Sequence, residues 1–156
     1  MKINRIRLVP ASPAHVGRIA NRLREMDRIE CEARGRSAKQ SLRRALRASS
    51  WAITAFVDER PEAMFGISPV STIEDRGCPW FLGTDEVFRH GRDMLTIGGS
   101  VVAQMHRHSG RLENSVATIN EPAIRMLRRW GFTVDDAPFM VGGVEFVRFW
   151  REAKHV

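Results

Sequence analysis

Arginine is the side chain whose abundance in this sequence first suggests a chemistry. The 156 residues include 25 Lys and Arg against 18 Asp and Glu, a formal net charge of +7. Among the basic residues only Lys2, Lys39 and Lys154 are lysine. Because a guanidinium is planar and can bind a phosphate or carboxylate through two parallel hydrogen bonds, this composition suits contacts to anions. Two interpretations stay open: a basic solvated surface, and a surface that binds an anion or nucleic acid.

Two adjacent carboxylates, Asp85 and Glu86, and two histidines, His90 and His106, could transfer protons. Carboxylates and imidazoles are common acid–base groups in proteins. The segment 80–88, W-F-L-G-T-D-E-V-F, predicts a strand, so Asp85 and Glu86 would point to opposite faces of a sheet. Carboxylates at an edge or on the surface are the alternative interpretation.

Several other chemistries find no support in the sequence. It has no Ser-His-Asp order, Walker loop or zinc-finger spacing, and Glu30, Cys31 and Glu32 would bind a metal only by accident. Cys31 and Cys78 are far apart, so free or buried thiols are expected, with a disulfide as the alternative. No apolar run approaches the roughly 20 residues that span a bilayer. The segment 1–7 has no apolar signal region, and a cytoplasmic location is expected.

Apolar periodicity divides the chain into strands and helices of one expected domain, residues 1–156. Ser12 is expected to cap a helix that begins at Pro13. Gly83 suggests a bulge or a close backbone approach, and the Gly98-Gly99 pair suggests close packing of a helix against the sheet. The expected strands are 3–9, 51–57, 63–68, 80–88 and 141–149, and the expected helices are 13–28, 37–48 and 92–106.

The segment 115–132 adds a buried strand, a capped helix and a glycine stop. Asn120 is a good N-cap, and Pro122 falls in the first turn, where its missing N–H costs nothing. Gly131 suits a left-handed position after the helix. The apolar face of this helix comprises Ala123, Ile124, Leu127 and Trp130. The element order, β-α-α-β-β-β-α-β-α-β, predicts an α/β fold with a mixed sheet and helices on both faces.

Residues 120–132, N-x-x-A-I-x-x-L-x-x-x-G-F, resemble the last strand–helix unit of the GCN5-related N-acetyltransferases (GNAT), which typically has tyrosine where Leu127 stands. The segments 79–90 and 142–149 are similar to a small family of T7-like bacteriophage proteins with an acetyltransferase-like fold, some linked to virion assembly. The resemblance implies a mostly antiparallel sheet that splays at its centre to admit the pantetheine arm of acetyl-CoA.

The resemblance also implies site residues. Glu86, with Asp85 beside it, would be the base that takes a proton from the acceptor amine. Asn120 would touch the pantetheine arm, although capping alone also accounts for it. The usual pyrophosphate spacing, Q/R-x-x-G-x-G/A, is not matched, and the chain has no tyrosine to act as the acid. A phosphate cradle would instead come from Val87, Phe88, Arg89, Gly91 and Arg92 with the amides that follow.

Two functions follow from the resemblance. The first is an N-acetyltransferase that transfers an acetyl group from acetyl-CoA to an amine. The second is a non-catalytic phage or prophage protein that keeps the fold, acts in virion assembly and contacts phage structural proteins. Nucleic-acid binding through the arginine-rich surface is a third hypothesis.

Overall fold

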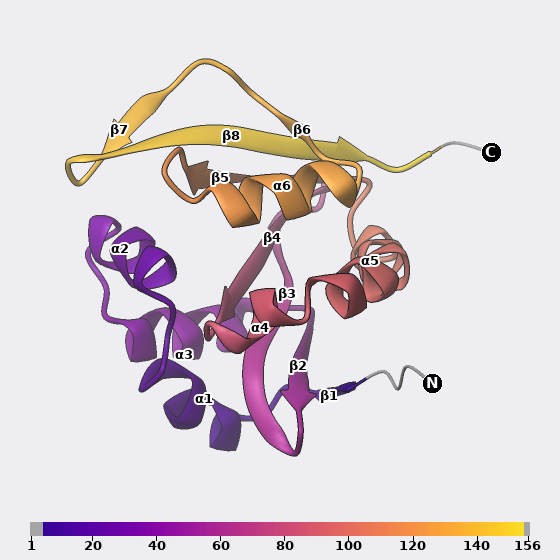
Figure 1. Cartoon of the computed structure of the whole chain (residues 1–156). Coiled ribbons are helices and arrows are strands. Elements are labelled where there is room, and N and C mark those ends of the chain that lie inside the picture. The colour runs from indigo at the N-terminus through magenta and orange to yellow at the C-terminus, as the bar shows by residue number, and fades with distance from the viewer. Residues whose placement is uncertain (1–4, 155–156) are drawn as a thin grey trace.

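The computed structural model describes residues 5–154, which form a mixed sheet with helices on both faces (Figure 1). The helices are α1 (Pro13–Ala20), α2 (Glu25–Ala33), α3 (Ala38–Ala48), α4 (Glu86–Arg89), α5 (Gly91–His106) and α6 (Glu121–Arg129). The strands are β1 (Ile6–Pro10), β2 (Trp51–Val57), β3 (Arg60–Ser71), β4 (Arg76–Gly83), β5 (Arg111–Ala117), β6 (Thr133–Val134), β7 (Phe139–Val141) and β8 (Val144–Glu152).

The sheet contains one parallel pair within an otherwise antiparallel arrangement. Its strand order is β1-β2-β3-β4-β5-β8-β6, and β7 also pairs with β8. The parallel pair is β4 with β5, and the other pairs are antiparallel. The predicted fold class, a mixed and mostly antiparallel sheet covered on both faces, is confirmed.

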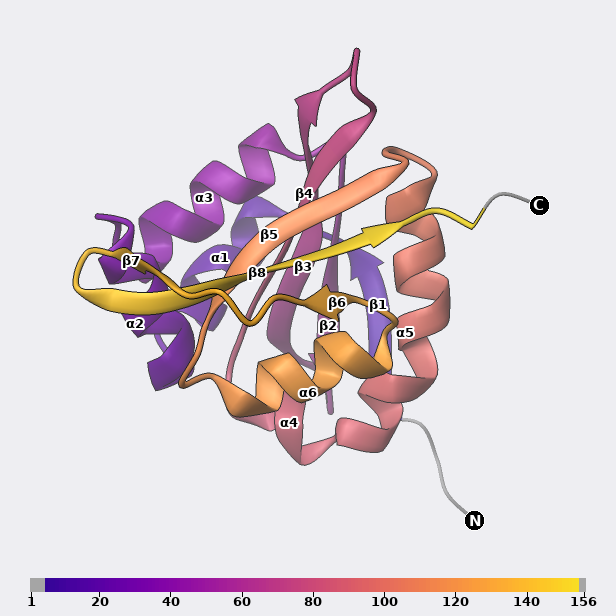
Figure 2. The same cartoon turned by 90° about the horizontal axis from the view of Figure 1, so that it is seen from above.

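Helices lie on both faces of the sheet (Figure 2). They bury two separate apolar clusters against it. Helices α1 to α3 cover one face, where Ile19, Leu42 and Met64 are fully buried. Helices α5 and α6 belong to the larger cluster on the other face, which includes Val101 and Trp130. The sheet is therefore apolar on both faces, as its near-continuous apolar strand sequences require.

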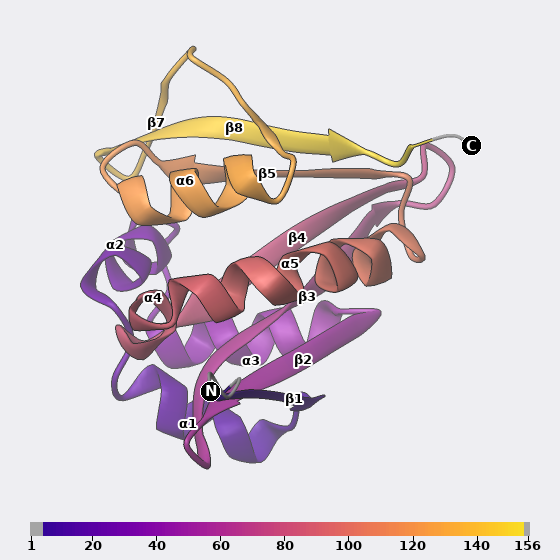
Figure 3. The same ribbon diagram turned by 45° about the vertical axis from the view of Figure 1, so that its right-hand side comes forward.

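Strands β4 and β5 separate soon after they meet. They pair only through Arg76↔Arg111 and Gly77↔Leu112, and then diverge toward α4 and α6 (Figure 3). Beyond this point β4 pairs only with β3, while β5 pairs with β8 as far as Ala117↔Phe146. The expected central splay is present, and it leaves two rows of backbone N–H and C=O groups without a neighbouring strand.

Predicted end signals are confirmed at α1 and α6. Ser12 accepts a hydrogen bond from the Ala14 N–H at the start of α1. Before α3, Ser37 forms a reciprocal capping box with Gln40, which was not predicted from the sequence. After α6, Gly131 has φ +88, its N–H donates to Arg128 O and the Phe132 N–H donates to Leu127 O. These two bonds form a Schellman motif.

The prediction of one helix over 13–28 is wrong. The chain forms α1 and α2 with a break between them, because residues 22–24 are held by the sheet. The Arg24 N–H donates to Gly83 O at 2.9 Å, and Leu23 forms a β-bridge with Thr84. Leu23 is buried there. The break turns α2 toward the splay.

The predicted strand 80–88 is also wrong at its end. β4 begins at Arg76 and ends at Gly83; the Thr84 N–H still donates to Glu62 O of β3, and at Asp85 the backbone turns to helical angles, φ −62 and ψ −23. Asp85 and Glu86 therefore lie at the start of the short helix α4, so they do not alternate across a sheet. Gly83 is a close approach and no bulge: an added Cβ would lie 2.9 Å from Val87 Cγ2.

Smaller corrections concern other strand ends. The strand expected over 141–149 begins as the hairpin β7–β8, with Gly142 and Gly143 at φ 53 and 79 in its turn. The strand expected to reach Ile119 ends at Ala117, and Ile119 is exposed. β3 is longer than predicted, and residues 3 and 4 of the first expected strand lie outside the described range.

Candidate functional site

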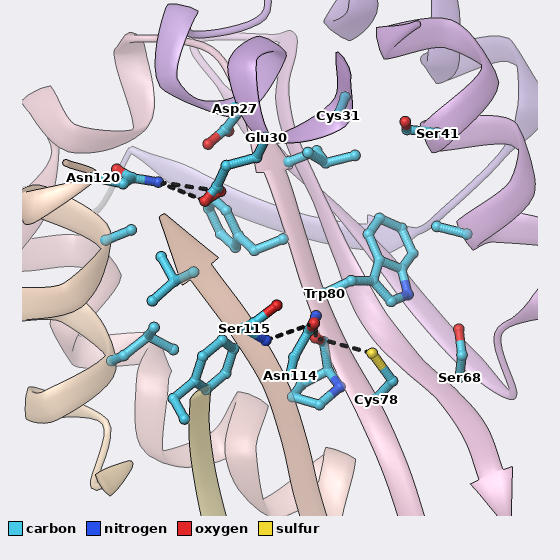
Figure 4. Close-up of a pocket in the computed structure, with 18 of the residues that line it drawn as sticks. Asp27, Glu30, Cys31, Ser41, Ser68, Cys78, Trp80, Asn114, Ser115 and Asn120 are labelled. Atoms are coloured by element: carbon cyan, nitrogen blue, oxygen red, sulfur yellow. Dashed lines mark hydrogen bonds between the residues drawn. The ribbon is translucent and has the colours of Figure 1, made fainter. Parts of the chain in front are cut away.

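A cavity of about 430 Å³ occupies the space between the diverging strands β4 and β5 (Figure 4). Its apolar wall comes from the sheet and from helices α5 and α6. Its polar wall comes from α2 and α3. The apolar wall includes Phe81, Met105, Val116, Ala123, Met126, Leu127, Trp130, Phe132 and Phe149.

The cavity opens on the side of α2 and α3. Of its lining residues, those exposed to solvent are Arg34, Arg44 and Ala48, all at the end of α2 or on α3. The lining residues of α6 are buried or half-buried. A ligand would thus enter past α3 and reach an apolar interior.

Side chains replace the strand partner that the splay removes. The Gly83 N–H donates to Asp27 Oδ2 at 2.9 Å, and the Ala117 N–H donates to Glu30 Oε1 at 3.1 Å. Pro79 O accepts from Asn114 Nδ2 at 2.6 Å. Ser115 O accepts from Arg34 at 3.2 Å. A buried backbone group without a partner costs about 1–3 kcal/mol, so these contacts hold the splay open.

Phe81 lies between two of these satisfied positions on β4 and lines the cavity. Because backbone groups alternate along a strand, its N–H and C=O face the same side as the C=O of Pro79 and the N–H of Gly83. No side chain within residues 5–154 forms a hydrogen bond with them. The middle of β4 therefore presents one free donor and one free acceptor to the cavity.

Asn120 does not cap α6, contrary to the prediction. Its side chain is turned into the fold, where its Oδ1 accepts from Arg24 at 3.1 Å. Arg24 also donates to Asp27 Oδ1 at 2.9 Å, and its guanidinium lies 4.2 Å from the ring centre of Phe88. Burial raises the pKa of Asp27 to about 7, against the opposing effect of the Arg24 charge.

Glu30 is the carboxylate that enters the cavity from α2. Besides the Ala117 N–H, it accepts from Asn120 Nδ2 at 3.3 Å (Figure 4). Burial raises its pKa, while the Ala117 and Asn120 hydrogen bonds act in the opposite direction. A half-buried carboxylate with a raised pKa, at the wall of a cavity, is suited to accept a proton near neutral pH.

Both cysteines line the same cavity and are free thiols, as expected (Figure 4). Burial raises the pKa of Cys31 and of Cys78. Both side chains are therefore protonated at neutral pH, and each can act as a weak proton donor.

The residues predicted for the site are only partly brought together. Glu86 lies on α4, ion-paired with Arg89 and 3.8 Å from His90 Nε2, and Asp85 is exposed. His106 lies on α5, where its Nδ1 is 3.1 Å from Ser109 O. Within the described part of the chain, Asn120 is the predicted cofactor residue that lines the cavity, whereas five others do not: Val87, Phe88, Arg89, Gly91 and Arg92.

Sequence reasoning missed Arg24, Asp27 and Glu30. A weak signal existed, because Asp27 and Glu30 are three residues apart on one side of a helix and Asp27 falls on the apolar spacing of 13–28. Charged residues in an amphipathic helix usually belong to the solvated face. Only the contacts with β4 and β5 reveal their role.

Two other classes of site can be addressed directly. Across residues 5–154, no group of three or more His, Cys, Asp or Glu side chains could hold a metal ion. No helix in this range is both long enough and apolar enough to cross a membrane.

The mostly antiparallel sheet with helices on both faces matches the fold of solved structures of GNAT-family acetyltransferases. No model of a known protein family matches the sequence, and no curated protein matches it either. The fold is therefore identified from solved structures.

Three such structures illustrate the likeness. Ard1 from Thermoplasma volcanium matches with a TM-score of 0.72 and 13% identity, over 97% of this chain and 99% of that chain. A GNAT-family acetyltransferase from Bacillus anthracis matches with a TM-score of 0.67 and 8% identity, over 97% of this chain and 96% of that chain. A Bacillus subtilis acetyltransferase in complex with CoA matches with a TM-score of 0.64 and 9% identity, over 96% of this chain and 99% of that chain. At these identities the likeness concerns the fold.

Proposed function

We propose that this chain is an N-acetyltransferase that passes an acetyl group from acetyl-CoA to an amine. The observation that carries the proposal is the cavity between β4 and β5, with the Glu30 carboxylate in its wall. Solved structures with the same fold are acetyltransferases, and one of them is a complex with CoA.

The cavity fits the thioester end of the cofactor. Phe81 offers one free N–H and one free C=O in the middle of β4, and an arm that contains amides can pair with both. When bound, acetyl-CoA supplies an activated acetyl group. The apolar wall formed by Met126, Leu127 and Trp130 keeps water away from it.

The segment predicted to bind the phosphate end of acetyl-CoA, residues 84–92, suits that role less well. Residues 84–92 form helix α4 and the start of α5, and the side chain of Arg89 is paired with Glu86. Gly91 has open space around its Cα. The phosphate cradle of Val87, Phe88, Arg89, Gly91 and Arg92 stays a prediction.

In the proposed reaction Glu30 accepts the proton of the amine. Its raised pKa makes it a better base near neutral pH than an ordinary glutamate. Leu127, at the position of the usual tyrosine, cannot donate a proton to the leaving thiolate. The protonated thiol of Cys78, in the same cavity, is the proposed substitute.

Glu30→Gln tests this assignment, because glutamine keeps an oxygen that can accept from the Ala117 N–H. We expect kcat/KM with an amine acceptor to fall by about 10²–10⁴-fold with little change in Tm. Glu32→Gln, on the exposed side of the same helix, is the matched control and should keep activity.

Glu86→Gln compares the two candidate bases. A loss of activity in Glu86→Gln that equals or exceeds the loss in Glu30→Gln would return the role to the residue that the sequence predicted. If wild-type protein neither binds acetyl-CoA at millimolar concentration in calorimetry nor releases CoA with any amine, the transferase proposal fails.

A non-catalytic phage or prophage protein of virion assembly is the second candidate. The observation that favours it is the closed end of the splay near α4, where Arg24, Asp27 and Asn120 are bonded to one another and to Gly83. Mass spectrometry of purified particles would detect such a protein as a stoichiometric component. Its absence from particles, together with turnover of acetyl-CoA, would exclude this role.

Nucleic-acid binding through the arginine-rich surface stays a prediction. Phosphate contacts must weaken steeply as salt rises. A mobility shift with DNA that is absent, or unchanged between low and high salt, would contradict it.

A further inference from the structure

The mouth of the splay cavity carries an excess of positive charge. Four arginines line the cavity, Arg24, Arg34, Arg36 and Arg44, against two carboxylates, Asp27 and Glu30. Both carboxylates lie deeper, in contact with Gly83 and Ala117. Among the charged residues that line the cavity, the exposed ones are Arg34 and Arg44, so the charge exposed at the mouth is positive.

Two of these arginines already have partners. Arg24 is bonded to Asp27 and Asn120. Arg34 donates to the Ser115 hydroxyl at 2.7 Å, and its guanidinium lies 4.7 Å from the ring centre of Phe146. Both side chains are fixed to the protein and shape the wall.

Arg36 and Arg44 have no ion-pair partner within residues 5–154. Arg36 is half-buried immediately before the capping box of α3, which fixes the chain direction there, and Arg44 lies two turns further along the same helix. Two unpaired guanidiniums beside an open cavity raise the local concentration of anions and repel cations.

We propose that Arg36 and Arg44 form an anion subsite at the mouth of the splay cavity, which holds a phosphate or carboxylate group of the ligand that enters it. Guanidinium is the side chain best suited to both groups, because its planar donors match two oxygens. A polyamine would be disfavoured at this mouth.

The anion has two sources if the proposed transferase function holds. One is an amine acceptor that carries an anionic group at its other end. The other is a phosphate of CoA itself. The subsite depends only on the cavity and on the charges of Arg36 and Arg44, so a protein without catalytic activity would still bind such ligands.

Calorimetry with matched ligand pairs tests the subsite. O-phosphoethanolamine is compared with ethanolamine, and 4′-phosphopantetheine, the phosphorylated arm of CoA, with pantetheine; the members of each pair differ by one phosphate group. We expect the anionic member of at least one pair to bind about tenfold more tightly, and less so at high salt. Preference in the first pair assigns the anion to the acceptor, and preference in the second assigns it to the cofactor.

Paired variants separate a built subsite from diffuse surface charge. The double variant Arg36→Gln with Arg44→Gln should weaken binding of the preferred anionic ligand by about tenfold. The control is Arg43→Gln with Arg47→Gln, two exposed arginines of α3 that do not line the cavity, and it removes the same net charge. Equal losses in both double variants, or binding of 1,3-diaminopropane as tight as that of the anions, would overturn the proposal.

The outcomes distinguish this inference from the transferase proposal. Turnover of acetyl-CoA with neutral or cationic amines, unaffected by the arginine variants, would refute the subsite and leave the transferase function intact. Phosphate-dependent binding without any turnover would support the subsite and count against catalysis.

Discussion

Gly98 allows the sharpest test of how α5 and α6 enclose the cavity. It is buried in the middle of α5 against the indole of Trp130, which is itself buried at the end of α6. A Cβ added to Gly98 would lie 2.7 Å from the indole Cε2 and nearer still to Nε1. Real Cβ atoms essentially never come so close, so Gly98→Ala forces the indole or the helix to move.

The neighbouring Gly99 provides the control. It is exposed, and a Cβ there meets nothing within 4 Å. Both substitutions gain the helix preference of alanine over glycine, about 1 kcal/mol. Overpacking costs about 1–3 kcal/mol and applies only at Gly98. We therefore expect Gly99→Ala to be stabilised by about 1 kcal/mol, and Gly98→Ala to be less stable than Gly99→Ala by about 1–3 kcal/mol.

Urea unfolding measures the difference, and a thermal melt should show it as a Tm gap of about 2–4 °C per kcal/mol. Trp130→Leu removes the indole edge, so adding Gly98→Ala to that variant should cost less than adding it to the wild type. Equal stabilisation by the two alanine substitutions, or a cost at Gly98 that Trp130→Leu leaves unchanged, would refute the packing argument.

Two further predictions concern a buried carboxylate and a helix end. Because the pKa of Asp27 is raised from 3.8 to about 7, the folded state holds its proton more tightly, and this stabilisation is full below about pH 4 and lost as pH rises through 7. At 1.36 kcal/mol per pH unit the loss is as much as ~4 kcal/mol; urea unfolding from pH 4.5 to 7.5 should show a steeper slope in wild type than in Asp27→Asn, which keeps the contribution of the raised pKa of Glu30, and parallel curves would contradict it. Gly131→Ala should lower the free energy of unfolding by about 1–2 kcal/mol, because φ +88 is unfavourable for alanine; an unchanged urea midpoint would show that Gly131 does not need this conformation.

The features predicted well from sequence depend on few consecutive residues. The Ser12 cap needs only the Ala14 N–H two residues later, and the stop after α6 needs only Gly131 and Phe132. Such hydrogen bonds form within one turn, so residue type and spacing contain the information. The fold class followed for the same reason, since it rests on the order of strongly periodic segments.

The features predicted wrongly depend on contacts between distant segments. The predicted strand 80–88 runs past Gly83, but there Arg24 bonds to Gly83 and Leu23 bridges Thr84, and the chain turns into α4. Asn120 has an ideal local partner in the first turn of α6. It bonds instead to Arg24 and Glu30, which are 96 and 90 positions away. Both arrangements satisfy its amide, so sequence alone cannot choose between them.

The contacts of α2 determine where a ligand can act in the splay. Asp27 and Glu30 already satisfy the backbone N–H groups of Gly83 and Ala117, so a ligand that displaced either contact would remove a hydrogen bond from a carboxylate inside the fold. Phe81 and the two arginines of the mouth have no such competitor. A ligand therefore gains most by pairing with the middle of β4 while its charge stays at the mouth. Such a ligand leaves the contacts of Asp27 and Glu30 with Gly83 and Ala117 intact.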